Sequence, residues 1–223
     1  MCELLPLFPL GMVLFPGLVL PLHVFEERYR VLVRDLSALP EHQRSFGVVA
    51  IREGREIGEE GVRALHAVGC SAQVHRVHEH EDGRFDLVTA GARRFRLDAL
   101  HSDRPYLTAD VEWLPDEVGD ADEAAVLAGP VTAALTDYLA ALVELGAGEV
   151  TLPELPTDPL VLSHLVGATL HVDLGDRQAL LEAADGRTRL RAELTLMRRE
   201  AVLLRALRVV PAPELSRAAV SPN

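Results

Sequence analysis

Residues 4–25 read LLPLFPLGMVLFPGLVLPLHVF, and His23 is the one ionisable residue in this stretch. An apolar run of this length could cross a bilayer as a helix. Four prolines, at positions 6, 9, 16 and 21, oppose a helix, because each removes a backbone donor and its ring clashes with the preceding turn. We therefore expect two short buried strands, broken at residues 15–18 (FPGL) by a type II turn in which glycine takes the positive φ.

The segment after this run has the spacing of an amphipathic helix. One apolar face recurs at helical intervals and is formed by Phe25, Tyr29, Leu32, Val33 and Leu36. Glu26 and Glu27 stand in its first turn, where the helix dipole favours negative charge. Residues 1–40 thus predict a strand, a turn, a second strand and a helix.

Further short apolar or alternating segments follow, separated by turn residues. We expect strands over residues 46–51, 64–80 (with a possible bulge at Gly69), 85–91, 93–97 and 106–114. Asp82-Gly83 lies between two of these segments and is typical of a tight hairpin turn. About six strands with tight turns and one early helix favour a small, mostly antiparallel β-barrel.

Beyond an acidic linker at residues 116–122, apolar residues recur with a helical period instead of the period of two seen in strands. The first helical stripe comprises Val126, Leu127, Val131, Leu135, Leu139, Leu142 and Leu145. Gly129-Pro130 should kink or split this helix, and Asp158-Pro159 is typical of another helix start. Helices over residues 176–185 and 187–207 complete a predicted helical bundle.

The sequence therefore predicts an α+β protein in three parts. A mostly antiparallel β-barrel with one helix would occupy residues 1–117, a helical bundle residues 118–210, and a flexible tail residues 211–223. Prolines at positions 211, 213 and 222 are the reason for ending the bundle near residue 210.

The net charge is -12, and all 22 basic residues are arginine. A chain of this charge repels nucleic acid over most of its surface. Without lysine the sequence offers no P-loop lysine, no Schiff-base amine and no Ser-Lys dyad, so we expect no ATP hydrolysis, no catalysis of these kinds and no cofactor. No export signal precedes the apolar run, and two cysteines do not suggest a disulfide framework. A cytoplasmic protein without a membrane partner is expected.

The densest set of metal-ligating side chains comprises His75, His78, Glu79, His80, Glu81 and Asp82. On a strand, His78 and His80 share a face and His75 points away. Two ligands beside a flexible hairpin turn make a poor site without a further ligand from elsewhere in the chain. The expectation is therefore a solvated hairpin tip and no bound metal.

Two other functions stay open on the residues alone. No Gly-x-Ser-x-Gly elbow is present, but a hydrolase triad built from distant residues would not be visible in a sequence. Arg93, Arg94 and Arg96 form a local basic patch, with Arg94 and Arg96 expected on the exposed side of an alternating strand. This patch makes RNA binding the alternative function, although acidic residues nearby offset its charge.

The run LPLFPLGMVLFPGLVLPLHVFEERYRVLV, residues 5–33, closely resembles the opening of the Lon N-terminal domain, the substrate-recognising segment of the ATP-dependent protease Lon. Gly91 followed by Arg94-Phe95, and later Asp158-Pro159 and residues 177–182 (RQALLE), also match that family's pattern. The resemblance covers about residues 3–208. It implies a PUA-like barrel and a free-standing member of the family without the ATPase and protease domains.

The same resemblance implies a non-catalytic function: ATP-independent binding of unfolded or flexible protein segments, as an adaptor or regulator for a protease or chaperone in protein quality control. The candidate peptide contacts are Met12, Phe15 and Leu18 around the first turn, together with Trp113. They are chosen because an apolar turn tip, if exposed, would be typical of an interaction site.

Overall fold

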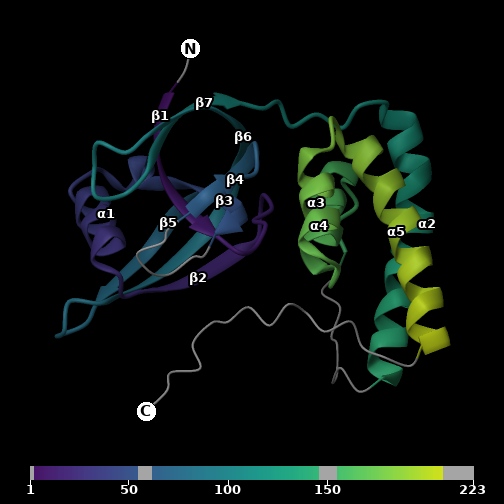
Figure 1. Cartoon of the computed structure of the whole chain (residues 1–223). Helices are drawn as coiled ribbons and strands as arrows, with labels where there is room; N and C mark the ends of the chain where they lie inside the picture. The colour runs from purple at the N-terminus through teal and green to yellow at the C-terminus, as the bar shows by residue number, and fades with distance from the viewer. Residues whose placement is uncertain (1–2, 55–61, 146–154, 208–223) are drawn as a thin grey trace. The chain divides into compact units, whose positions relative to one another are not determined.

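The computed structural model describes residues 3–54, 62–145 and 155–207. Contacts within the chain divide it into two compact units, Met1–Pro115 and Asp116–Asn223. The first holds strands β1 to β7 and helix α1, and the second holds helices α2 to α5 (Figure 1). This combination confirms the α+β class, whereas the predicted tail at residues 211–223 lies outside the described residues.

The sheet of the first unit closes on itself. Its elements are β1 (Glu3–Leu10), β2 (Val19–Val24), α1 (Glu27–Ser37), a 3₁₀ turn (Glu41–Gln43), β3 (Ser45–Gly54), β4 (Val62–Leu65), β5 (Val68–Glu79), β6 (Phe85–His101) and β7 (Thr108–Trp113). Neighbouring strands follow the order β1-β7-β6-β5-β3, and β3 pairs with β1 again. Only the β1–β3 pairing is parallel among the described strands. Strand β2 adds to β6, and β4 adds to β3.

The apolar N-terminal run folds as two strands and a turn, as its prolines predict. Leu18 donates its backbone N–H to the Phe15 carbonyl at 3.2 Å, and Gly17 has a φ of 80°, which is the geometry of a type II turn. The turn is fixed to β6, because Gly17 donates to the Gly91 carbonyl and Gly91 donates to the Leu18 carbonyl. A Cβ atom at Gly91 would overlap the Phe15 carbonyl oxygen, so this close approach requires glycine.

The two strands predicted at residues 85–91 and 93–97 are one long strand, β6. Its pairing with β5 shifts between Gly91 opposite Ala72 and Arg94 opposite Cys70, so β6 carries an extra residue there. The Ser71 hydroxyl bridges this bulge, accepting from the Arg93 N–H at 3.0 Å and donating to the Arg93 carbonyl at 3.2 Å. The bulge resets the alternation of faces, and Arg94 becomes buried beside Phe95.

Helix α1 packs on the larger apolar cluster of the first unit. Its buried residues are Tyr29, Leu32, Val33 and Leu36, as predicted. The rings of Tyr29 and Phe8 stack with centroids 4.0 Å apart, which joins the helix to β1. Phe25 was predicted on the same face but is exposed, because the helix begins two residues later at Glu27.

The second unit consists of α2 (Ala121–Glu144), α3 (Pro159–Thr169), α4 (Leu174–Glu182) and α5 (Gly186–Leu207). The prediction that Gly129-Pro130 could split the first of these helices is wrong, because α2 continues through Pro130. Pro130 lies on an exposed side, where water can bond the carbonyl group that has lost its helical partner. Val126 was predicted in the apolar stripe but is 74% exposed.

Helix starts and packing seams in the second unit follow the predicted pattern. The Asp158 carboxylate caps α3 by accepting from the backbone N–H groups of Leu160 and Val161. The buried seam of α5 comprises Leu190, Leu194, Met197, Ala201 and Leu204. Helix α2 is long and apolar enough to cross a membrane. Of its most apolar 18-residue stretch, 33% is buried within the protein, and the core helices of soluble proteins have the same length and composition, so α2 is weak evidence for a membrane span.

Candidate functional site

The predicted apolar contacts around the first turn are only partly accessible. Phe15 has 0% of its surface exposed and is therefore unavailable to a ligand. Met12 and Leu18 are half-buried and pack against the cluster under α1. The FPGL turn is hydrogen-bonded to Gly91 of β6, and its Phe15 side chain is buried, so the turn does not expose an apolar group of side chains to solvent.

Trp113 belongs to a different part of the first unit. It packs against the second apolar cluster, which is formed by residues of β1, β3, β6 and β7. Its indole N–H donates to the Glu3 carboxylate at 2.7 Å, and the Arg93 guanidinium lies 4.5 Å above its ring. The four predicted contact residues therefore do not form one surface.

The three arginines of the RNA-binding alternative are also separated. Arg94 is 2% exposed, and its Nη2 donates to the Pro115 carbonyl at 2.9 Å, so the prediction that it lies exposed is wrong. The cause is the bulge in β6, which a simple alternation of faces cannot anticipate. Arg93 covers Trp113, and Arg96 pairs with Glu112 at 3.2 Å.

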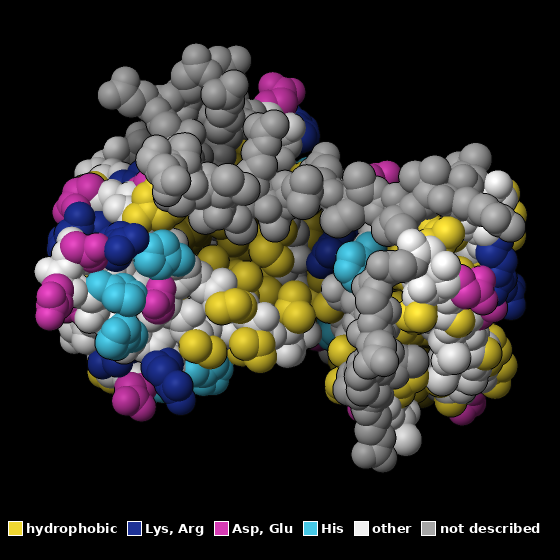
Figure 2. Space-filling view, turned by 90° about the horizontal axis from the view of Figure 1, so that it is seen from below, with side chains coloured by type: hydrophobic (Ala, Val, Ile, Leu, Met, Phe, Trp, Pro, Cys, Tyr) yellow, Lys and Arg dark blue, Asp and Glu magenta, His cyan; other side chains and the backbone are white. Residues whose placement is uncertain are grey.

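One group of exposed apolar side chains lies on β2 and β6. In the antiparallel pairing, Pro21 stands opposite Val88 and His23 opposite Asp86. We call Val19, Pro21, His23, Asp86 and Val88 the β2 surface. Val19 is 60% exposed and Val88 is 38% exposed. Figure 2 shows hydrophobic side chains gathered on this unit, with histidine, acidic and arginine side chains to one side of them.

Strand β2 is an edge strand among the described residues, since it pairs with β6 and with no other strand of that part of the chain. The carbonyl groups of Leu18 and Leu20 point toward β6, where they accept from the Gly91 N–H and the Thr89 hydroxyl. Alternation then directs the backbone groups of Val19, Pro21 and His23 to the open edge. Pro21 has no N–H to offer there, which is the position in a sheet where proline is tolerated.

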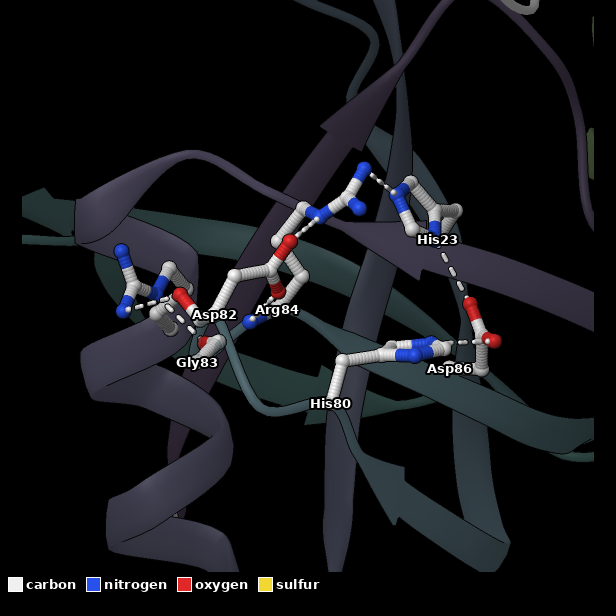
Figure 3. A network of polar contacts seen from close by, with 7 residues as sticks. His23, His80, Asp82, Gly83, Arg84 and Asp86 are labelled. Carbon is white, nitrogen blue, oxygen red and sulfur yellow. Dashed lines mark hydrogen bonds and ion pairs between the residues drawn. The ribbon is translucent and has the colours of Figure 1, made fainter.

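The polar end of the β2 surface is a hydrogen-bonded network (Figure 3). His23 Nδ1 lies 2.6 Å from one Asp86 carboxylate oxygen, and His80 Nε2 lies 2.7 Å from the other. Arg84 Nη1 lies 3.3 Å from His23 Nε2; because a guanidinium only donates, this contact assigns the ring proton of neutral His23 to Nδ1. Hydrogen bonds from His23 and then His80 lower the pKa of Asp86 below its ordinary value of 3.8.

The hairpin that carries His80 is anchored, which the sequence did not predict. Arg30 of α1 donates from Nε to the Gly83 carbonyl at 2.6 Å. Within the turn, the Asp82 carboxylate accepts from the Arg84 backbone N–H at 3.1 Å and from its Nε at 2.6 Å. Asp86 is thus held on strand β6, and His80 lies between the end of β5 and a braced turn.

Sequence reasoning missed His23 and Asp86 as members of one group. Fifty-seven residues separate His23 from His80, so no local motif joins them. The sequence did hold one relevant pattern. If residues 19–24 form a strand, Val19, Pro21 and His23 lie on the same face of it, because alternate residues of a strand share a face. The pairing of β2 with β6 is what places that face beside Asp86.

Comparison with protein families matches residues 4–199 to the model described as "ATP-dependent protease La (LON) substrate-binding domain". Lon protease 2 of Myxococcus xanthus is 30% identical over 205 residues, which are 91% of this chain and 24% of that protein. The Lon protease of Escherichia coli K12 is 28% identical over 201 residues, 90% of this chain and 25% of that protein. The chain thus spans about a quarter of the length of these relatives.

Two solved structures with a similar fold are also Lon N-terminal domains. A crystal structure of a Lon N-terminal domain protein from Xanthomonas campestris is 28% identical, with a TM-score of 0.62, and the match covers 86% of this chain and 98% of that one. The N-terminal domain of a Mycobacterium avium complex Lon protease has a TM-score of 0.63 over 88% of this chain and 98% of that one. At 21% identity this second match shows likeness of fold alone.

Proposed function

The chain belongs to the Lon substrate-binding domain family, and from that premise we propose that it is a non-catalytic module that binds unfolded or flexible segments of other proteins. The family description names substrate binding, and the relatives are named as Lon proteases. Our proposal extends the binding of protein substrates to this chain. Binding would not require ATP, because the sequence holds no lysine for a P-loop.

The observation that carries this proposal is the β2 surface. It combines exposed aliphatic side chains with an open strand edge whose carbonyl groups are available to an extended peptide. Exposed apolar side chains that adjoin one another are typical of interaction sites. The surface also differs from the predicted contacts, since Val19, Pro21 and Val88 replace the buried Phe15.

The proposal includes finer assignments. The first unit would be a PUA-like barrel, with a barrel subdomain over residues 1–117 and a bundle subdomain over residues 118–210. The ring of pairings from β1 through β7, β6, β5 and β3 back to β1 supports the barrel. We further propose a cytoplasmic role as an adaptor or regulator in protein quality control, with a protease or chaperone as partner.

The experiment measures fluorescence anisotropy of a labelled extended peptide rich in leucine and phenylalanine, titrated with the full chain without nucleotide. Replacing Val19 and Val88 together by serine removes apolar contact area that the peptide would bury, and should weaken binding about tenfold. Both side chains are exposed, so the fold should be retained, which circular dichroism checks.

The matched control is Val126→Ser, because Val126 is even more exposed but lies in α2. Its affinity should equal that of the unchanged chain. Absence of peptide binding, or an equal loss in the Val126 variant, would contradict the proposal. Salt-dependent binding of labelled RNA in place of the peptide would support the alternative function.

A further inference from the structure

We propose that His23, His80 and Asp86 form a binding site for a divalent transition-metal ion such as Zn²⁺. Each of the three offers one ligand atom, and these atoms all lie within 4.8 Å of one another. The sequence alone opposed a metal at this hairpin because it showed two neighbouring histidines and no further ligand. The fold supplies the missing ligand, since β2 brings His23 beside the hairpin.

The geometry already directs the donor atoms toward one place. His23 Nδ1 and His80 Nε2 each face an oxygen of the same Asp86 carboxylate, at 2.6 and 2.7 Å (Figure 3). In the structure these positions are joined by N–H···O hydrogen bonds. A cation that replaced the two ring protons would keep all three side chains together, with a nitrogen, a nitrogen and an oxygen as ligands.

The ligand set selects the class of ion. Two imidazoles and one carboxylate suit Zn²⁺, Ni²⁺ or Cu²⁺, whereas Mg²⁺ and Ca²⁺ prefer sites made of oxygen. Three protein ligands leave a coordination position for water. The His78 ring lies 4.9 Å from that of His80, and His78 pairs with Asp86 across β5 and β6, so another imidazole adjoins the site.

The site is also held by its surroundings. His23 and Asp86 stand opposite each other on paired strands, and Arg30 braces the turn that follows His80. His23 and Asp86 lie on strands, and His80 directly follows β5, so none of the three ligands depends on a loose loop. A bound ion would join β2 to the β5–β6 hairpin through side chains, in addition to the backbone pairing.

One neighbour opposes the ion. Arg84 donates to His23 Nε2, but a metal on Nδ1 would require the ring proton at Nε2. Arg84 would then have to withdraw, and its bond to Asp82 gives it another partner. Its positive charge also repels a cation. Replacing Arg84 by methionine should therefore tighten metal binding by about threefold, an effect reduced by salt.

The test is calorimetric titration of Zn²⁺ into the full chain after treatment with a chelator. One Zn²⁺ per chain is expected, and Zn²⁺ should raise the unfolding temperature reversibly. His23→Ala and His80→Ala should each lower the affinity at least about tenfold. Mg²⁺ should produce no comparable heat. The unfolding temperature of each metal-free variant shows whether its fold is kept.

The matched control is His75→Ala, since His75 is an exposed histidine of β5 outside the group of three. It should bind Zn²⁺ as the unchanged chain does. The proposal is overturned if the unchanged chain binds no Zn²⁺, if the His23 or His80 variant binds equally well, or if the His75 variant loses as much affinity. Equal or weaker binding by Arg84→Met would contradict the opposition to the ion assigned to Arg84.

Discussion

The sheet unit and the helical unit bury polar side chains for different purposes. Among the residues that the structure describes, the buried polar ones are Ser71, Thr89, Arg94 and Thr108 in the sheet unit, and Ser163, His164, Gln178, Arg189 and Glu193 in the helical unit. Those of the first unit bond mainly to backbone groups at irregular places of the sheet. In the second unit, Arg189 bonds groups of two other helices and His164 bonds Asp116 ahead of α2, whereas Gln178 bonds Glu182 within α4.

In the sheet unit, Ser71 bridges the bulge of β6, Thr89 bonds the Leu20 carbonyl of β2, and Arg94 bonds the Pro115 carbonyl. Backbone pairing already fixes the register of the strands. Side-chain bonds add to this pairing at the bulge of β6, between β6 and β2, and just beyond the end of β7.

In the helical unit, Arg189 of α5 donates from Nε to the Leu180 carbonyl of α4 at 2.9 Å and from Nη1 to the Ser163 hydroxyl of α3 at 2.8 Å. Glu193, one turn further along α5, is also fully buried. Helices satisfy their backbone groups internally, so backbone bonds cannot set how they dock on one another. In this chain Arg189 of α5 bonds groups of α3 and α4 through its side chain, whereas the strands of the sheet are joined by their backbone ladder.

The substitution expected to change stability most, and so to test this comparison most strongly, is Arg189→Ala. It removes the bonds to α3 and α4 together with the cation beside Glu193, and should cost about 4 kcal/mol of the free energy of unfolding. Urea unfolding followed by circular dichroism at 222 nm reports mainly the helices. Fluorescence of Trp113, the single tryptophan, reports the sheet unit and should change less.

The matched control for that substitution is Arg191→Ala. Arg191 is an exposed arginine of the same helix, paired with Glu123, and its loss should cost less than about 1 kcal/mol. Equal costs for the two variants would show that the buried arginine does not position the helices.

A second test uses the same substitution in each unit. Gly91→Ala places a Cβ on the Phe15 carbonyl oxygen, so strand β6 or the FPGL turn must move, at a cost of about 3 kcal/mol. Gly129→Ala, in α2, places no Cβ within 4 Å of any atom other than its chain neighbours and its own helix, and should stabilise the helix by less than about 1 kcal/mol, because the following Pro130 crowds the new Cβ. Thermal unfolding of both variants measures the difference. The same sign for the two would contradict the packing described for Gly91.

The smallest test concerns pH. Burial raises the pKa of Glu193 well above its ordinary 4.5, and the charge of Arg189 opposes this only in part. Between pH 4.5 and the folded pKa, the folded state holds a proton that the unfolded state has lost. The free energy of unfolding should therefore fall as pH rises through this window, by at most about 1.4 kcal/mol per pH unit.

Glu193→Gln removes the titrating group and should make the stability of the helical unit flatter over the same window. The measurement is the difference in urea midpoints, by circular dichroism, between the unchanged chain and this variant at several pH values. Identical slopes for the two proteins would mean that Glu193 does not titrate in this range.

Local patterns predicted most of the elements and part of the core. The prolines of residues 4–25 excluded a helix, the FPGL turn formed as expected, and the seam of α5 is buried throughout. Errors arose where the outcome depended on which side of a helix faces water. Pro130 did not split α2 because its lost hydrogen bond faces water, and Val126 lies outside the buried stripe.

The sequence by itself determined the class of fold, the type and approximate place of most strands and helices, and the resemblance to the Lon N-terminal family, because these depend on residues close together in the chain. Tertiary structure alone decided which side chains meet. It buried Phe15 and Arg94, exposed Val19 beside Val88, and brought His23 to His80 across fifty-seven residues. The physical reason is that strand pairing and bulges set these neighbours, and both depend on contacts that no local period records.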